Sequence, residues 1–323
     1  MKTITHERPV GEIGRSVVSV GNFDGVHRGH RQLASIVRKR AGVHKASSVM
    51  VTFDPHTRTV IHPNRPQQLL TTFDEKQLLF EQLGIDYLIR IPFNAEYAKM
   101  SSESFVEQVL IKRLHAVEWV MGENHTFGKD RKSGEKFLHE YGGRNHFSMF
   151  IADLHAEGSA VISSTAIRTA IRHSKVESAV SMLGHPYLIL AQRISGVHKG
   201  TEMGVPTLNF RHPGGNKVMP PPGVYAAELA FGKRRWAGAL YFGNCPTFID
   251  RDFHFEFHAF EQDREFPELG DRAALWMHRF IRADRTFDNE RKLVEQIRHD
   301  INRIRTFFSQ EQSWYATHQR KEA

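Results

Sequence analysis

The chain has 323 residues, of which 40% are apolar and 25% charged, with 44 Lys and Arg against 36 Asp and Glu. This length predicts about two domains, and the composition excludes disordered, collagen-like and coiled-coil proteins. No apolar run approaches the roughly 18 residues of a membrane helix, and residues 1–16 lack the apolar stretch of a signal peptide. The lone cysteine, Cys245, excludes an intrachain disulfide framework and a cysteine-based zinc module. We therefore expect a cytoplasmic enzyme or binding protein.

The net charge of +8 is spread over the chain. Before Gly184 there are 24 Lys and Arg against 19 Asp and Glu, and after it 20 against 17. The densest basic run, Arg38-Lys39-Arg40, falls late on an expected helix, where positive charge suits the helix dipole. Neither half is a basic tail, so we expect no nucleic-acid and no membrane partner.

Strands and helices alternate in the first half. Short apolar runs predict strands, and apolar residues three and four apart, such as Leu33, Ile36 and Val37, predict helices. The expected strands are Val17–Val20, Val49–Phe53, Tyr87–Ile91, Val117–Met121 and Phe147–Ile151. The further expected helices are Glu75–Leu83 ended by Gly84, Phe105–Leu114 opened by Ser101 and Ser102, Thr165–Ile171 and Val176–Leu183. Strands separated by helices indicate an α/β fold with a parallel sheet covered on both faces.

The second half has strand-like segments separated by Gly/Pro-rich turns, without helices between them. These segments are Tyr187–Ser195, Val224–Phe231, Arg235–Phe242, Phe253–Phe260 and Ala274–Phe280. They predict a small antiparallel β-barrel, followed by an amphipathic helix at about Asn289–Phe308. The change of pattern near Gly184 predicts domains at residues 1–184 and 185–323.

Residues 21–30, Gly-Asn-Phe-Asp-Gly-Val-His-Arg-Gly-His, follow a strand and open a helix. Ligands of open α/β sheets bind at the carboxyl ends of strands, and a helix N-terminus offers free N–H groups to a phosphate. The glycines allow close backbone approach, while His27 and His30 can face one ligand and stabilise phosphate charge. The alternatives are a glycine-rich turn with two exposed histidines, or a zinc pair for which no third ligand is apparent.

This segment resembles the HxGH signature of the nucleotidylyltransferase superfamily, in the form of the prokaryotic bifunctional riboflavin kinase/FMN adenylyltransferases. Thr52–His56 resembles the family's TFxPH segment, Gly122–Gly128 its GExFxFG loop, and Ser163–Arg168 its SSTxIR motif. The resemblance implies a Rossmann-like domain in which the FMN phosphate attacks the α-phosphorus of ATP. Pyrophosphate leaves, Mg²⁺ assists and FAD is the product, so that the protein supplies mainly positioning and charge neutralisation.

The resemblance also implies roles for individual residues. His27 and His30 are the expected catalytic residues. The residues expected to bind ATP are Gly21, Asn22, Phe23, Asp24, Gly25, Gly29, Ser164, Thr165 and Arg168. The residues expected to bind the flavin are Phe53, His56 and Asn124. Three residues depart from the family's pattern, which affects flavin binding more than adenylyl transfer: Thr57, where proline is usual, His125 and Ala166.

Two segments of the second half carry candidate chemistry. Thr207 and Asn209, in Gly-Val-Pro-Thr-Leu-Asn, point the same way if the chain is extended, and their oxygens suit Mg²⁺ held with nucleotide phosphates. Taken alone, this segment is more often an ordinary turn than a ligand site. Residues 253–258 alternate Phe with His254, Glu256 and His258, so the polar three share one face. Glu256 is then a solvated carboxylate, a general base, or part of a His-x-Glu-x-His metal site.

These segments resemble the riboflavin kinase domain of the same family. Residues 204–209 are similar to its GFPTAN motif, 243–248 to its GxRPTF turn and 280–287 to its FLRxExKF segment. The resemblance implies that Thr207 and Asn209 bind Mg²⁺ and ATP, with Gly196 and Gly200 in the phosphate loop. Glu256 then deprotonates the ribityl 5′-hydroxyl, which attacks the γ-phosphate, and Arg282 lies near the flavin.

The second half of the chain departs further from the family's sequence pattern than the first half does. Ser195 and Thr201 stand where the family's phosphate loop carries His and Arg, and Cys245 replaces an Arg. We expect adenylyl transfer to tolerate its departures better than the kinase reaction does. A flavin-nucleotide-binding protein, or an FMN adenylyltransferase with a degraded kinase half, is the alternative. The expected partners are ATP, riboflavin and FMN; family members can associate, which leaves a homo-oligomer open.

Overall fold

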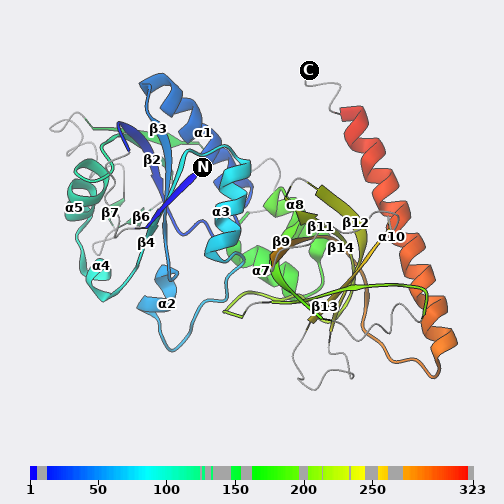
Figure 1. The fold of residues 1–323 in the computed structure, drawn as a ribbon. Coiled ribbons are helices and arrows are strands. Elements are labelled where there is room, and N and C mark those ends of the chain that lie inside the picture. The colour runs from blue at the N-terminus through cyan, green and yellow to red at the C-terminus, as the bar shows by residue number, and fades with distance from the viewer. Residues whose placement is uncertain are drawn as a thin grey trace. The chain divides into compact units, whose positions relative to one another are not determined.

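The protein is described from a computed structural model of residues 1–323. The described residues are 1–5, 13–123, 126–127, 132–133, 147–153, 162–195, 203–212, 214–232, 234–243, 254–260 and 272–318. They form two compact units, Met1–Ser164 and Thr165–Ala323 (Figure 1). Within these ranges, no helix is both long and apolar enough to cross a membrane.

The first unit is built on a six-stranded sheet in the order β1-β4-β3-β2-β5-β8. Every pairing in it is parallel. The strands are β1 (Lys2–Thr5), β2 (Ser16–Val20), β3 (Ser47–Phe53), β4 (Tyr87–Ile91), β5 (Ala116–Gly122) and β8 (Ser148–Ala152). All five residues of β2 are buried, as a strand covered on both faces requires. The predicted α/β class with a parallel sheet is confirmed.

Helices cover this sheet because its strands are apolar on both faces. Val18 and Val20 share a buried cluster with Val109 and Leu110, which belong to a helical segment made of α5 (Ser102–Phe105) and η1 (Val106–Ile111). Helix α1 (Arg28–His44) contacts β2, β3 and β5. The other helices of this unit are α2 (Thr57–Ile61), α3 (Phe73–Gln82) and α4 (Ala95–Lys99).

The structure corrects the predicted Phe105–Leu114 helix. The segment starts as α5 at Ser102 and continues as a π-helix, with Lys112 N–H donating to the Glu107 carbonyl five residues back. The buried residues of this segment, Val106, Val109 and Leu110, still lie three and four positions apart. Three short elements were not predicted from the sequence: β1, α2 and α4, each of which is four or five residues long.

The second unit carries a closed barrel in the order β10-β13-β12-β11-β14-β9. All its pairings are antiparallel, which confirms the predicted barrel. The strands are β9 (Tyr187–Ile194), β10 (Leu208–Arg211), β11 (Gly223–Phe231), β12 (Arg234–Gly243), β13 (His254–Ala259) and β14 (Arg272–Ala283). Phe255 and Phe257 of β13 are fully buried, as the Phe alternation predicted.

Helices of the second unit pack on the outside of the barrel. Ile304 and Phe308 of α10 (Glu290–His318) join Val224, Ala226 and Ile281 in a second apolar cluster. Helix α8 (Val176–Leu183) contacts β9 and β14 and follows α7 (Ser164–Arg172). Helix α10 packs against β11, β12 and β14 on one side of the barrel (Figure 1).

One buried ion pair fixes α1 to the sheet. The Glu118 carboxylate on β5, 2% exposed, accepts bonds of 2.7 and 2.5 Å from Arg40 and one of 3.1 Å from Ser148. Burial raises the pKa of Glu118, but the hydrogen bonds and charge of Arg40, with Ser148 and His44, outweigh it and hold the pKa below its usual range. The pair therefore stabilises the fold above the carboxyl's unfolded pKa, and this contribution is lost as the pH falls through the lowered one.

Glu118→Ala is expected to lower the free energy of unfolding by about 3 kcal/mol at neutral pH. The difference from the wild type shrinks below about pH 4, where the carboxyl is protonated in the unfolded chain. Urea unfolding at pH 7 and pH 3 measures both values. Glu107→Ala is the control, because Glu107 pairs with Lys112 at the surface and such pairs contribute at most about 1 kcal/mol. Equal effects of the two changes at pH 7 contradict the assigned role of Glu118.

Candidate active sites

The strand order of the sheet places a switch point at β2. Strand β2 lies between β3 and β5. After β2 the chain adds β3 on one side, and later it adds β5 on the opposite side. Such a switch of direction is where ligands bind in open α/β sheets. The loop of residues 21–27 leaves β2 at this point, and residues 54–56 leave the adjacent β3.

The loop after β2 has an unusual backbone. Three of its residues have positive φ: Phe23 at 46°, Gly25 at 85° and Val26 at 41°. A β-branched residue such as Val26 is strained in this region, and strain of this kind concentrates at ligand-binding sites. A side chain at Gly21 would come within 3.0 Å of the Phe23 ring, so this glycine permits the tight turn.

Asp24 anchors the loop from inside. Its Oδ1 accepts hydrogen bonds from the N–H groups of Leu70 and Thr71, at 2.9 and 3.0 Å, and the residue is only 2% exposed. The Thr71 hydroxyl also accepts a 2.9 Å bond from Gly25 N–H. Asp24 therefore shapes the loop, and contact between its carboxylate and ATP stays a prediction.

His27 and His30 lie together at the start of α1. Their rings stack with centroids 3.6 Å apart and 19° between planes, and Phe23 meets His30 edge to face at 5.3 Å. His27 is the N-cap residue, and the first turn of α1 contains no acidic side chain. The helix N-terminus and the two imidazoles thus form one place where a phosphate would be stabilised.

Asn22 is held by Thr57, one of the residues that depart from the family's pattern. The Asn22 amide nitrogen donates to the Thr57 hydroxyl at 2.9 Å, and Thr57 N–H donates to the Asn22 Oδ1 at 3.2 Å. The Asn22 carbonyl also accepts from Thr52. Proline lacks both an N–H and a hydroxyl, so the usual family residue would make neither bond with Asn22.

The residues expected to bind flavin lie at the end of β3. Phe53 is half-buried and meets Phe93 edge to face, with centroids 5.3 Å apart. His56 is 7% exposed, and its Nδ1 accepts from Arg58 N–H to cap α2. Aromatic side chains therefore lie near the loop after β2, while Asn124 lies outside the described residues.

Ser164 contacts the loop after β2 directly. Its hydroxyl donates to the Asp24 carbonyl at 2.9 Å. Thr165 and Arg168 follow on α7, where Thr165 is exposed and Arg168 is 5% exposed. Gly29 lies in the first turn of α1, beside the His27 ring. The structure thus brings Ser164 together with the loop that carries the two histidines.

Lys76 is a buried lysine near the same loop that was not predicted as a site residue. It lies on α3, is 3% exposed, and its Nζ lies 3.4 Å from the Thr52 hydroxyl. Burial lowers the pKa of Lys76, and Arg90 lowers it too, while the carboxylates of Asp24 and Asp54 partly offset this shift. A lysine in an amphipathic helix carries no signal of burial, so only the fold reveals it.

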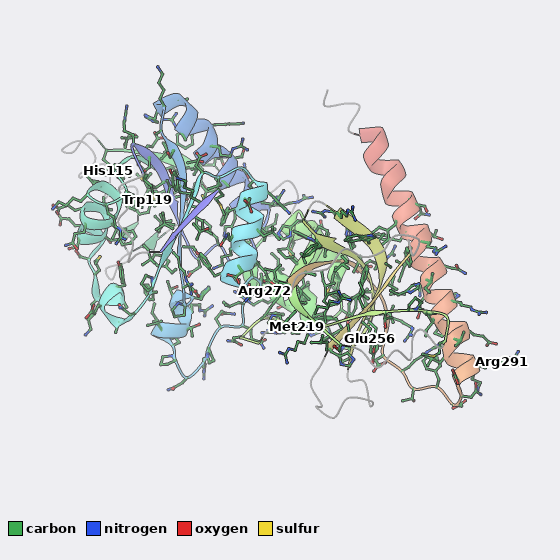
Figure 2. The ribbon with its side chains drawn as sticks, in the orientation of Figure 1. His115, Trp119, Met219, Glu256, Arg272 and Arg291 are labelled. Atoms are coloured by element: carbon green, nitrogen blue, oxygen red, sulfur yellow. The ribbon has the colours of Figure 1, made fainter. Side chains whose placement is uncertain are left out.

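In the barrel, Glu256 lies on β13 and pairs across the ladder with Asn209 of β10 (Figure 2). Its side chain is 26% exposed, and its Oε1 lies 3.3 Å from His254 Nε2. His254 and His258 are only 3% and 7% exposed, so this face is mostly covered rather than solvated. A carboxylate held by a histidine while retaining access to solvent is suited to accept a proton.

Thr207 and Asn209 present hard oxygen atoms beside that carboxylate. Both are half-buried, and within the described ranges neither side chain makes a hydrogen bond. The described residues contain no group of three His, Cys, Asp or Glu arranged to hold a metal ion. Gly196, Gly200, Thr201 and Cys245 lie outside the described residues.

Arg282 is fixed by α10 rather than free to move. Its Nε donates to the buried Asp300 carboxylate at 2.7 Å, and its guanidinium lies 5.8 Å from the Phe287 ring centroid. Phe287 lines a cavity of about 540 Å³ whose other lining residues include Arg285 and Lys292. Arg282 therefore lies beside Phe287 at a cavity of mixed charge, since Asp288 and Glu295 line it as well as the two cations.

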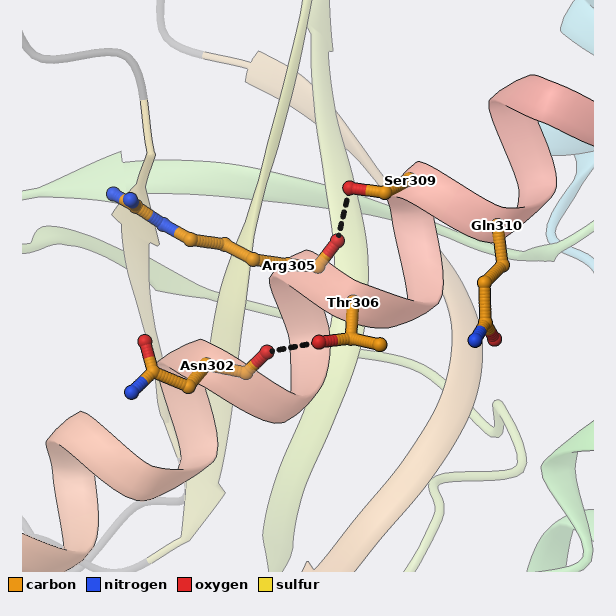
Figure 3. Close-up of a pocket in the computed structure, with 5 residues that line it drawn as sticks. All are labelled: Asn302, Arg305, Thr306, Ser309 and Gln310. Atoms are coloured by element: carbon orange, nitrogen blue, oxygen red, sulfur yellow. Dashed lines mark hydrogen bonds between the residues drawn. The ribbon is translucent and has the colours of Figure 1, made fainter.

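A second cavity, of about 650 Å³, lies against α10 (Figure 3). Asn302, Arg305, Thr306, Ser309 and Gln310 line it. The Thr306 and Ser309 hydroxyls donate to carbonyls one turn earlier in the helix, and Arg305 lies over the Phe260 ring. This polar cavity adjoins the end of β13, the strand that carries Glu256.

Comparisons with known proteins match both units. The family model described as FAD synthetase matches residues 11–166, and the one described as riboflavin kinase matches residues 183–308. The bifunctional riboflavin kinase/FMN adenylyltransferase of Bacillus subtilis is 31% identical over 318 residues, covering 96% of this chain and 99% of that protein. The protein of the same name from Escherichia coli K12 is 29% identical over 293 residues, covering 90% and 92%.

A solved structure has the same architecture across nearly the whole chain. It is described as a macrolide-efflux protein from Streptococcus pneumoniae, with a TM-score of 0.77, 27% identity, and coverage of 92% of this chain and 97% of that one. The two matched family models, the relatives over nine-tenths of the chain and the two sites agree. This chain belongs to the bifunctional riboflavin kinase/FMN adenylyltransferase family.

Proposed function

We propose that the N-terminal unit transfers the adenylyl group of ATP to FMN, and that the barrel phosphorylates riboflavin with ATP. The observation that carries the first activity is the stacked His27 and His30 at the N-terminus of α1. The second rests on Glu256, which pairs across the ladder with Asn209. We place the boundary between the two catalytic domains near Gly184, which ends α8 with a φ of 73°. We also propose that the protein acts in the cytoplasm.

In the N-terminal site, a phosphate oxygen of FMN attacks the α-phosphorus of ATP. The bond from that phosphorus to the bridging oxygen breaks, and pyrophosphate leaves. His27, His30 and the free N–H groups of α1 stabilise the charge that grows on the phosphate oxygens. Ser164, tied to the Asp24 carbonyl, lines the same loop, and Phe53 lies at the flavin side. This reaction needs positioning more than acid–base chemistry.

In the barrel, Glu256 accepts the proton of the ribityl 5′-hydroxyl as that oxygen attacks the γ-phosphorus of ATP, and ADP leaves. His254, 3.3 Å away, holds the carboxylate in place. The oxygens of Thr207 and Asn209 fit Mg²⁺, since they are hard donors without a described hydrogen-bond partner. Mg²⁺ supplies neutralisation of phosphate charge there, and Arg282 is proposed to lie near the flavin.

Two assays of the purified protein test the proposal. Riboflavin with ATP and Mg²⁺ is expected to give FMN and then FAD, and FMN with ATP and Mg²⁺ is expected to give FAD and pyrophosphate. Chelating Mg²⁺ with excess EDTA is expected to stop both reactions, because the transferring phosphates lose their counter-charge. FAD from FMN, but no FMN from riboflavin, supports instead the alternative of a degraded kinase half, which Ser195, Thr201 and Cys245 suggest.

A further inference from the structure

His258 lies next to the proposed kinase residues but has no role so far. It follows Glu256 by two positions on β13, on the same face, and is 7% exposed. Its ring packs near Phe260, with centroids 6.2 Å apart. Its Nδ1 lies 2.9 Å from the carbonyl oxygen of Pro206, the residue before Thr207.

The protonation of His258 follows from that contact. A carbonyl oxygen only accepts hydrogen bonds, so Nδ1 must carry the proton. Burial lowers the pKa of His258, the bond to Pro206 partly restores it, and the charge of Arg305 lowers it further. The ring is therefore neutral at neutral pH, with a proton fixed on Nδ1.

The hydrogen bond between His258 and Pro206 lies outside the ladder between β10 and β13. The ladder between β10 and β13 starts at Leu208, which pairs with Phe257. Pro206 and Thr207 lie before that first rung, and a proline has no N–H with which to join a ladder. The bond from His258 thus extends the attachment to β13 by two residues beyond the strand, across Thr207.

We propose that His258 is a positioning residue of the kinase site, whose Nδ1–H holds the Pro206 carbonyl so that Thr207 and Asn209 present their oxygens to metal-bound ATP. This inference rests on the proposed kinase function. It assigns no contact between His258 and substrate. Its effect is expected in the affinity for MgATP rather than in the chemical step.

Three variants test the geometry: His258→Asn, His258→Gln and His258→Leu. An Asn amide reaches the position of Nδ1 and can still donate to Pro206, whereas a Gln amide reaches toward Nε2 and Leu has no donor. We expect His258→Leu and His258→Gln to raise the KM for MgATP in riboflavin phosphorylation about tenfold, the value of one lost hydrogen bond. His258→Asn is expected to stay within about threefold of the wild type, and kcat is expected to change little in all three.

The two activities of the chain provide the controls. Formation of FAD from FMN reports on the other domain and is expected to stay unchanged, and the thermal transition shows whether each barrel folds. If His258→Leu does not fold, the Asn and Gln pair decides alone, because both side chains are polar amides. Equal KM values for Asn and Gln, or a loss confined to kcat, overturn the inference.

Glu256→Gln, assayed in parallel, separates this inference from the proposed function. If Glu256→Gln abolishes FMN formation but His258→Leu and His258→Gln keep the wild-type KM, the positioning role alone is wrong. If Glu256→Gln keeps full kinase activity, the kinase site itself is misplaced, and the role given to His258 is overturned with it.

Discussion

His30→Ala is expected to lower the rate of FAD formation from FMN and ATP by about 10²- to 10³-fold, the usual effect of removing one group that stabilises transition-state charge. His30 stacks on His27 at 3.6 Å and contacts Phe23, so the change also removes the support that orients His27. The phosphate charge that grows during adenylyl transfer then loses one imidazole and keeps His27, the helix N-terminus and Mg²⁺ as stabilisers. FAD formation under saturating FMN and ATP measures the effect.

His62→Ala is the matched control, since His62 is an exposed histidine at the end of α2 in the same unit. It is expected to leave both activities unchanged. Riboflavin phosphorylation by His30→Ala is also expected to match the wild type, because Glu256 lies in the other unit. If His30→Ala forms FAD within about threefold of the wild-type rate, the role assigned to the stacked histidines is wrong.

Glu256→Gln is expected to lower riboflavin phosphorylation by about 10²- to 10⁴-fold, the range for loss of a general base. The amide keeps the size of the side chain and can still contact His254, but it cannot take the proton of the attacking hydroxyl. FMN formation from riboflavin measures the effect, and FAD formation from FMN is expected to stay at the wild-type rate.

Glu177→Gln is the control for loss of a carboxylate in the same unit. Glu177 lies on α8, is half-exposed and pairs with Arg279 at the surface, so its removal is expected to change neither activity. The kinase assignment fails if the Glu256 and Glu177 variants phosphorylate riboflavin equally well.

Sequence patterns predicted the elements that are long and strongly apolar. Tyr87–Ile91 and Val176–Leu183 have the predicted bounds, because each begins after a charged residue and ends before a proline or a glycine. The alternation of Phe in residues 253–258 predicted the buried Phe255 and Phe257 correctly. In these cases the burial pattern is local, so the sequence carries it.

Other features depend on partners distant in the sequence. The short strand β10 forms because it pairs with β9 and β13, and nothing in Leu208–Arg211 alone requires a strand. The π-helix η1 packs its apolar residues against those of the sheet strands, and nothing in its own sequence distinguishes it from an α-helix. Lys76 resembles any helical lysine until the fold buries it beneath the loop after β2.

The candidate sites also combine features that the local sequence predicts with features that depend on distant residues. The sequence named His27 and His30, and the structure stacks them. It also named Asn22 and Asp24, but their side chains bind Thr57 and Leu70–Thr71, which are 35 to 47 residues away. Such long-range bonds have no periodic signature, so the positions of site residues were predictable while their internal partners were not.

Under the proposed function, two independent ATP sites act in sequence, joined by FMN. Mixing His30→Ala with Glu256→Gln in the presence of riboflavin, ATP and Mg²⁺ tests it most directly, with FAD as the measured product. Each variant alone is expected to form almost no FAD from riboflavin. The mixture is expected to form FAD steadily, since one protein supplies FMN and the other adenylylates it. A mixture that forms no FAD, although each variant retains its own half-reaction, contradicts the claim.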